Sequence, residues 1–141
     1  MAYSAKQYAL WLLARRSYSV LKLKEKLLTK YETEEVEGTI NFLKNIQLLD
    51  DSEYGVRRAV FLSGKKSNRQ IKFELSQKGL APTDIESSLL EVDDEEVRLK
   101  NLLEKEKITP LNKDKIMQKY CRKGFQYHMV RKIIAEILST Q

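Results

Sequence analysis

Residues that interrupt helices are few in this sequence of 141 residues, and so are cysteine and histidine. It has five glycines and two prolines, which leaves long stretches free to be helical, and no clear segment alternates with a period of two. Cys121 is the single cysteine and His128 the single histidine. One cysteine allows no intrachain disulfide, and one histidine with one cysteine supplies too few of the usual ligands for a zinc site.

Long apolar runs are also missing. The longest unbroken run extends from Tyr8 to Ala14, far short of the roughly 20 residues that a membrane helix needs. Arg15 and Arg16 follow this run and no small-residue cleavage site is present, so the pattern is not that of a secretory signal. We therefore expect a cytoplasmic protein with no membrane partner.

Motifs for catalysis are missing as well. Residues 63–67, SGKKS, share part of a phosphate-binding loop, but Ala59 stands where that loop needs its first glycine, and the preceding segment is predicted to be helical rather than a strand. The acids Asp50, Asp51 and Glu53 are better explained as helix-start residues than as a metal site. We expect no enzymatic activity, no catalytic residues, no metal and no cofactor.

Apolar residues at helical spacing instead predict helices along nearly the whole chain. Trp11 lies on the apolar face of the first helix, Phe73 lies beside the apolar stripe of the fifth, and Val97 is expected to be buried by the seventh. The predicted helices cover about residues 4–16, 20–30, 33–47, 52–62, 68–78, 82–92, 94–106, 112–123 and 127–138.

These helices recur as a unit. Ser19, Ser67 and Asn112 are predicted N-caps that lie 48 and 45 residues apart, and apolar residues follow each of them at matching positions in two consecutive helices. Any single amphipathic helix ending in glycine would align in this way, but two helices in register three times are a real repeat. Because each unit is too small to bury its own core well, stacking should give an elongated or curved molecule. The sequence thus predicts an all-α fold, a tandem array of three three-helix repeats at residues 1–49, 50–92 and 93–141.

Positive charge gathers in two stretches, although the net charge is only +6. Between residues 54 and 79 the basic residues are accompanied by one acidic residue, Glu74. Between residues 111 and 132 they are again accompanied by one, Asp114. A single lysine is best explained as solubilising, but clusters on stacked units suit an acidic protein groove or a nucleic-acid backbone. Aromatic residues among these charges are few and most are expected to be internal, so base stacking on single strands has little support from the sequence. The candidate partner-binding residues are Arg57, Arg58, Lys65, Lys66, Arg69, Lys72, Lys113, Lys119, Arg122 and Lys123.

Three segments of the chain resemble the signatures of a known family. The central one contains Leu48-Leu49-Asp50-Asp51, Tyr54, Gly64, Ile71, Glu74-Leu75 and Lys78-Gly79-Leu80, and the C-terminal one contains Tyr120 and Arg122-Lys123-Gly124-Phe125. Together with an N-terminal segment from Leu12 to Leu27, they are similar in order and spacing to the bacterial RecX proteins. The resemblance covers about residues 8–137. Tyr31 departs from it by standing where a glycine is expected, and residues 126–128 replace the usual small capping and acidic residues.

The resemblance implies both a fold and a function. RecX proteins are tandem arrays of three-helix repeats that regulate the recombinase RecA, in homologous recombination, DNA repair and the SOS response. They bind within the groove of the RecA–DNA filament, bridge neighbouring subunits, and inhibit filament extension, ATP hydrolysis, strand exchange and co-protease activity. The implied partners are the RecA filament and the DNA backbone within it, and we expect a monomer.

Two other functions fit the residues. The chain could be a helix-turn-helix-like DNA-binding module, in which the second or eighth helix enters a groove. It could also be a helical adaptor for another partner. Against the DNA-binding module, no cluster of arginine, asparagine and glutamine on one helix stands out as a base reader.

Overall fold

The structure is a computed structural model that describes residues 3–141, and this part of the chain contains nine α-helices and no strands. The helices are α1 (Ala5–Arg15), α2 (Val20–Leu28), α3 (Thr33–Asn45), α4 (Asp51–Ser63), α5 (Asn68–Gln77), α6 (Pro82–Leu90), α7 (Glu95–Lys105), α8 (Lys113–Arg122) and α9 (Tyr127–Ser139). The predicted all-α class is therefore confirmed, with each helix close to its expected range.

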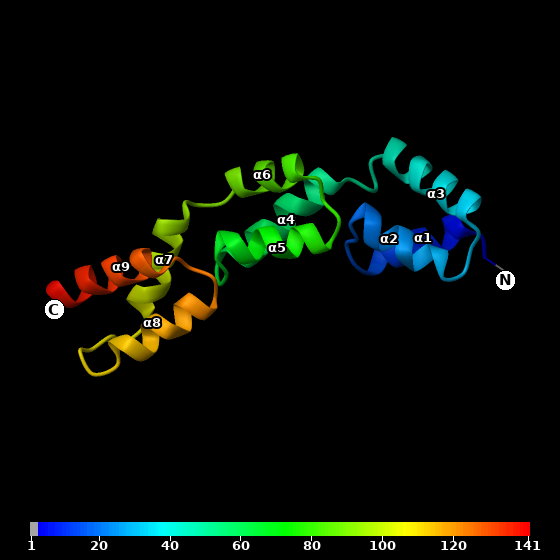
Figure 1. Cartoon of the computed structure of the whole chain (residues 1–141). Coiled ribbons are helices and arrows are strands. Elements are labelled where there is room, and N and C mark those ends of the chain that lie inside the picture. Colours follow the sequence, from blue (N-terminus) through cyan, green and yellow to red (C-terminus); the bar gives the residue numbers. More distant parts are fainter. Residues whose placement is uncertain (1–2) are drawn as a thin grey trace.

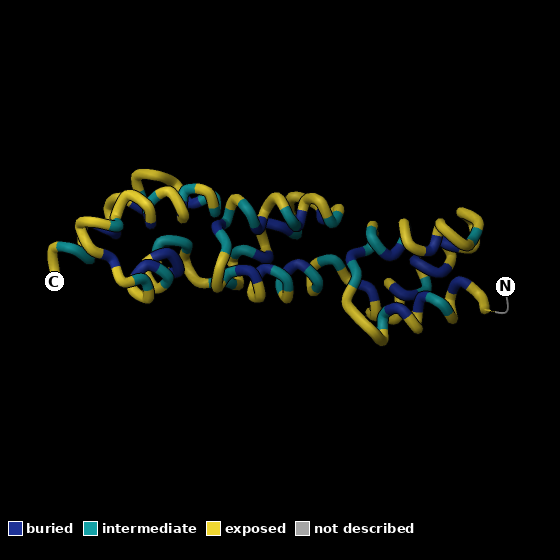
Figure 2. The backbone as a smooth tube through the Cα atoms, turned by 90° about the horizontal axis from the view of Figure 1, so that it is seen from below, coloured by how far each residue is buried: buried dark blue, intermediate teal, exposed yellow. Residues whose placement is uncertain are grey.

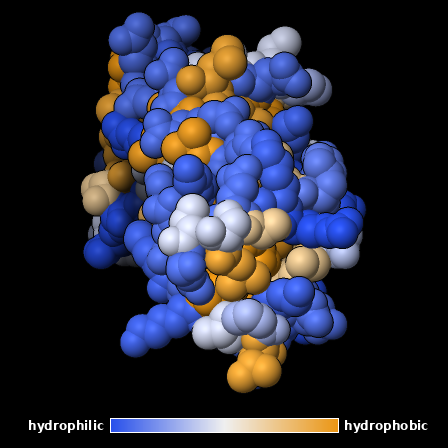
Figure 3. All heavy atoms as spheres, turned by 90° about the vertical axis from the view of Figure 1, so that its left-hand side faces the viewer, coloured by the Kyte–Doolittle hydropathy of each residue, from blue (hydrophilic) through white to orange (hydrophobic). Residues whose placement is uncertain are grey.

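The helices lie in a row of three groups, which makes the molecule long and narrow (Figure 1). Helices α1–α3 form one end, α4–α6 the middle and α7–α9 the other end, so the two termini lie far apart. This arrangement confirms the elongated helical array. Seen from the C-terminal end, hydrophilic side chains cover most of the surface, with separate hydrophobic groups between them (Figure 3).

Buried apolar side chains form three separate clusters rather than one core. The first cluster extends over residues 9–49, the second over residues 59–85 and the third over residues 99–134. The buried positions recur along the inner side of each group of helices (Figure 2). Each predicted unit contains one of these clusters, while the unit boundaries at 49/50 and 92/93 stay a prediction.

The N-caps of α2 and α5 also join neighbouring units. The hydroxyls of Ser19 and Ser67 accept the N–H groups of the first turns, as expected of caps. The Ser19 hydroxyl in turn donates to the carbonyl oxygen of Lys78 at 2.6 Å, and the Ser67 hydroxyl donates to that of Lys123 at 3.0 Å. The carbonyl end of α5 therefore meets the amino end of α2, and the carbonyl end of α8 meets the amino end of α5. This order aligns the three helix dipoles head to tail.

An acid on the following unit completes each junction. The first backbone N–H of α2, from Val20, donates to the Asp51 carboxylate at 2.8 Å, and the first N–H of α5, from Asn68, donates to the Glu95 carboxylate at 2.6 Å. Burial, the largest effect, raises the pKa of the Asp51 carboxyl, while this hydrogen bond opposes the shift. The two junctions thus repeat the same contacts, which keeps α2, α5 and α8 in one line.

Glycines permit the close approach at both junctions. Gly79 and Gly124 have φ angles of +84° and +99°, the left-handed region that favours glycine after a helix. A Cβ atom at Gly79 would lie 2.5 Å from the Leu21 side chain, and one at Gly124 would lie 2.4 Å from the Ser67 hydroxyl. In the first unit Tyr31 takes this position without a positive φ.

Four details of the sequence prediction were wrong. Trp11, Phe73 and Val97 were expected to face inward, but each is at least half exposed. In α5 the buried side chains are Ile71 and Leu75, four residues apart, so Phe73 lies on the opposite side of the helix. The Asn112 side chain accepts the N–H of Thr109 at 2.8 Å and does not cap α8.

Candidate partner-binding face

Three hollows in the surface meet at the side chain of Lys78. The first, of about 710 Å³, lies between α5 and the end of α8, and the other two lie where the α1–α2 turn approaches α4 and the end of α5. Their lining contains nine basic side chains against two acidic ones, Glu25 and Glu74. We call these nine side chains the basic face: Arg16, Lys22, Lys26, Arg57, Arg58, Lys66, Arg69, Lys78 and Arg122.

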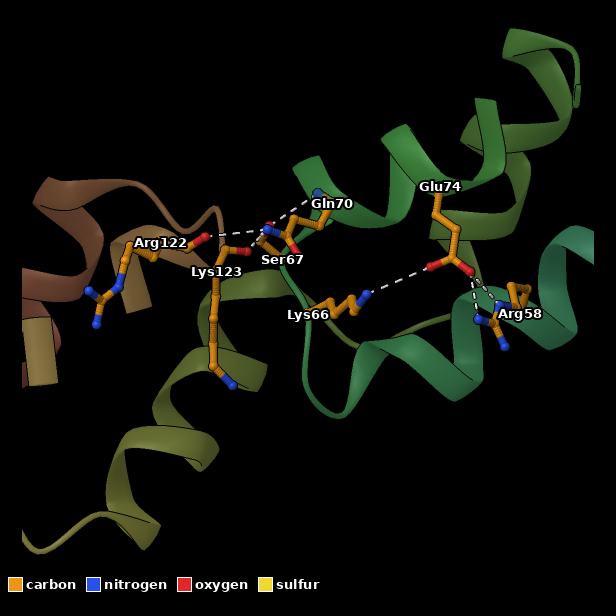
Figure 4. Close-up of polar contacts among 7 residues, drawn as sticks. All are labelled: Arg58, Lys66, Ser67, Gln70, Glu74, Arg122 and Lys123. Carbon is orange, nitrogen blue, oxygen red and sulfur yellow. Dashed lines mark hydrogen bonds and ion pairs between the residues drawn. The ribbon is translucent and has the colours of Figure 1, made fainter. Parts of the chain in front are cut away.

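Glu74 of α5 holds two members of the basic face in place. The guanidinium of Arg58, on α4, contacts one Glu74 carboxylate oxygen through Nε at 2.7 Å and Nη2 at 2.6 Å. The Lys66 ammonium lies 3.9 Å from the other oxygen (Figure 4). Because the Glu74 side chain is only 19% exposed, water screens these contacts less than it would on an open surface. The acid therefore orders two cations and still leaves the group positively charged.

The same region contains the second junction between units. Figure 4 shows that Ser67 and Gln70, at the start of α5, reach the carbonyl oxygens at the end of α8. Gln70 donates its side-chain N–H to the Arg122 carbonyl at 3.4 Å. This contact holds the backbone of Arg122 against α5. The junction thus places a basic residue of the third unit next to those of the second.

Arg98 of α7 fixes the loop that carries Lys66. Its side chain is 5% exposed and donates to the carbonyl oxygens of Ser63 at 3.2 Å, Lys66 at 3.0 Å and Asp93 at 2.9 Å, and to the Asn68 amide oxygen. Burial lowers the pKa of this guanidinium, and nearby acids oppose the shift. Sequence reasoning did not identify Arg98, because an arginine inside a predicted helix gives no sign that it will be buried.

Five of the ten predicted binding residues belong to the basic face, namely Arg57, Arg58, Lys66, Arg69 and Arg122. The other five lie elsewhere. Lys65 is over the Phe61 ring, Lys72 lines a further hollow beyond Phe73, and Lys113 is the first residue of α8. The Lys119 ammonium pairs with Glu106 at 2.8 Å, and that of Lys123 lies 5.5 Å from the centre of the Tyr120 ring. Partner binding by any of the ten stays a prediction.

Four members of the basic face were not predicted: Arg16, Lys22, Lys26 and Lys78. Arg16 and Lys78 lie at helix ends, where cations suit the dipole, and Lys22 and Lys26 lie on an outer helix face, so none of them stands out in the sequence. The available signal was the repeat, since helices that align in sequence present their outer faces in the same direction when the units stack.

The described residues offer little for other kinds of site. No group of three or more histidine, cysteine, aspartate or glutamate side chains between residues 3 and 141 is placed to hold a metal ion. Within the same range, no helix has the length and apolar character required to cross a membrane. Cys121 is a half-buried free thiol beside the first hollow, and His128 is exposed.

Comparison with known proteins places this geometry in a family. The family model described as RecX, first three-helix domain, matches residues 5–43. The regulatory protein RecX of Clostridioides difficile strain 630 is 33% identical over 150 residues, an alignment that covers 99% of this chain and 70% of that protein. The chain belongs to the RecX family. A second RecX, from Vibrio parahaemolyticus, is 37% identical over 92 residues, covering 62% of this chain and 58% of its own length.

Solved RecX structures share the fold. The crystal structure of RecX from Lactobacillus salivarius superposes with a TM-score of 0.78 at 24% identity, over 94% of this chain and 93% of that one. Another crystal structure of regulatory protein RecX gives a TM-score of 0.73 at 22% identity, over 92% of this chain and 69% of that one. The row of helical units in this RecX family member is therefore a family property.

Proposed function

We propose that this RecX family member regulates RecA by lying along the groove of the RecA–DNA filament, with its basic face toward the filament. The observation that carries the proposal is the continuity of the basic face, which runs from Lys22 and Lys26 on α2 past Lys78 to Arg122 on α8. It therefore includes residues from all three predicted units, 1–49, 50–92 and 93–141. A long, narrow molecule with cations along its length suits a partner that repeats.

The proposed regulation acts through binding and requires no reaction catalysed by this protein. Several weak contacts on linked units act together, so binding favours an assembled filament over free subunits. The nine cations speed docking onto an acidic groove or onto the DNA backbone within it, and they make docking depend on salt. A bound monomer that occupies the groove and fixes neighbouring subunits would hinder filament extension, ATP hydrolysis, strand exchange and co-protease activity in the cytoplasm.

The test is to titrate the protein into a RecA reaction and measure DNA-dependent ATP hydrolysis. The face variant is Arg69→Glu/Lys78→Glu/Arg122→Glu, because these side chains form no ion pair with other described residues. The control variant is Lys100→Glu/Lys105→Glu/Lys115→Glu, which changes the net charge equally at exposed positions outside the basic face. We expect the face variant to require a roughly tenfold higher concentration for half inhibition, while the control stays near wild type.

The two outcomes separate the alternatives. Equal inhibition by both variants at moderate salt would remove the basic face from the proposal. Failure of the wild-type protein to inhibit, together with tight and salt-dependent binding to naked single-stranded DNA, would favour a DNA-binding module instead. Circular dichroism of each variant should show unchanged helix content, because all six positions are on the surface or half-buried.

A further inference from the structure

Phe73 differs from two other exposed aromatic residues of the chain, Phe61 and Trp11. Its side chain is 66% exposed, and no described cation or aromatic ring lies against it. Phe61 is also exposed, at 56%, but Lys65 lies 4.4 Å and Arg58 5.1 Å from its ring centre. Trp11 likewise stacks on a tyrosine and has an arginine over its ring. Phe73 is thus an aromatic ring whose face is free for a partner.

Phe73 also stands between two hollows. One is the hollow between α5 and the end of α8, and the other, of about 930 Å³, lies between α5 and the turn from α8 to α9. The second hollow has Tyr127 in its lining, which is 59% exposed and also lacks a ring or cation partner among the described residues. Two aromatic side chains without partners therefore line one concave region at the junction of the second and third units.

The surroundings of Phe73 are polar and mostly basic, with one acid in each hollow, Glu74 in the first and Glu95 in the second. Arg69, one turn earlier on α5, lines both hollows, and Lys72 lines the larger one. Amide side chains, which donate and accept hydrogen bonds as peptide groups do, are present in both hollows, with Gln77 in one and Gln126 in the other. The site thus has an apolar centre, a positively charged rim and groups that suit a peptide backbone.

We propose that Phe73 is the anchor of a protein contact, and that its two hollows take an apolar side chain from an acidic segment of the partner. This inference rests on the proposed function, because it names the chemistry of the filament surface that the basic face meets. An exposed aromatic ring with arginine beside it is the composition of interface residues that carry most of the binding energy. Charge complementarity requires the partner segment to be acidic, and the amide side chains of the lining can pair with its backbone.

The experiment measures dissociation from a RecA filament assembled on single-stranded DNA with a non-hydrolysable ATP analogue and fixed to a sensor surface. We expect Phe73→Ala to dissociate roughly thirtyfold faster, the effect of losing one interface anchor, with an unchanged salt dependence of the association rate. Phe73→Leu should retain most of the wild-type residence time. The matched control is Trp11→Ala, which removes an exposed ring that Tyr8 and Arg15 already cover and that lines none of these hollows, and it should stay within about twofold of wild type.

Three results would overturn the inference in different ways. Dissociation of Phe73→Ala at the wild-type rate, from a filament that the wild-type protein binds normally, would reject the anchor and leave the proposed function standing. An equal loss of binding to a naked oligothymidylate probe would show that the ring contacts nucleic acid rather than protein. Absence of wild-type binding to the filament would reject the proposed function together with the inference.

Discussion

Replacing Arg98 tests whether one buried side chain holds the second and third units together. Arg98 belongs to α7, whereas three of its four hydrogen-bond acceptors, on Ser63, Lys66 and Asn68, belong to the end of α4, the α4–α5 loop and the start of α5. In Arg98→Ala these acceptors lose their donor, and a space remains where the arginine stem packed. We expect this variant to be less stable and to release the loop.

The size of the effect follows from the contacts. A neutral hydrogen bond contributes about 1 kcal/mol net and one with a charged donor about 1.5–3 kcal/mol, so four bonds from the guanidinium set an upper range of roughly 6–12 kcal/mol. Burial of the guanidinium offsets part of this, as the lowered pKa of Arg98 indicates, and water can replace the donor at the edge of the loop. We therefore expect Arg98→Ala to lower the free energy of unfolding by about 3 kcal/mol.

Urea unfolding followed by circular dichroism measures this loss. With an m-value of ~2 kcal/mol per M, 3 kcal/mol moves the midpoint by about 1.5 M, and weaker coupling between units should broaden the transition. Limited trypsin digestion reports on the loop directly, because cleavage after Lys65 or Lys66 should become faster. Arg98→Lys should be intermediate, since an ammonium cannot reproduce the fork of a guanidinium.

A matched position at the other junction provides the control. Tyr54 occupies the place of Arg98, three residues after the acid that binds a helix of the preceding unit, and its hydroxyl forms no hydrogen bond with other described residues. Tyr54→Phe should therefore change the free energy of unfolding by less than about 0.5 kcal/mol. The reasoning is refuted if Arg98→Met, which keeps the stem but no donor, is as stable as wild type. The buried hydrogen bonds would then add no net stability.

Further predictions concern glycines and an acid. Gly79→Ala should destabilise the protein by ~1–3 kcal/mol, because φ is +84° and the new Cβ would lie 2.5 Å from Leu21. Gly38→Ala should instead stabilise the protein by ~0.5–1 kcal/mol, because Gly38 lies in a helix and its Cβ would enter open space. Thermal melting of both variants checks the opposite signs. Two hydrogen bonds lower the pKa of Glu106 from its ordinary 4.5. The larger effect comes from Lys119 and the smaller from a tyrosine hydroxyl. The stability that Glu106 contributes is present above pH 4.5 and is lost as the pH falls through the lower folded value, so Glu106→Gln should flatten the acid limb of a stability profile.

Local patterns were sufficient to predict the helices. The 3.6-residue spacing of apolar side chains, the serine caps at Ser19 and Ser67, and the glycine stops at Gly79 and Gly124 depend only on residues near one another in sequence. The second role of the two serines depends on tertiary packing. Their hydroxyls reach carbonyl oxygens 59 and 56 residues away, and no local rule predicts which helix end will arrive there.

Only about half of the basic face was predicted, because its other members come together through tertiary packing. Counting charge along the chain identifies stretches, and it selects Lys119 along with Arg122 because they are neighbours in sequence. On a helix, residues three apart differ by about 60° in direction, and in the structure Lys119 pairs with Glu106 while Arg122 lines the hollow beside α5. Lys78 was missed because its hollows form only when α2, α5 and α8 stack end to end. The junctions therefore do more than join the units. By aligning equivalent helices, they turn basic residues that are scattered in the sequence into one continuous face.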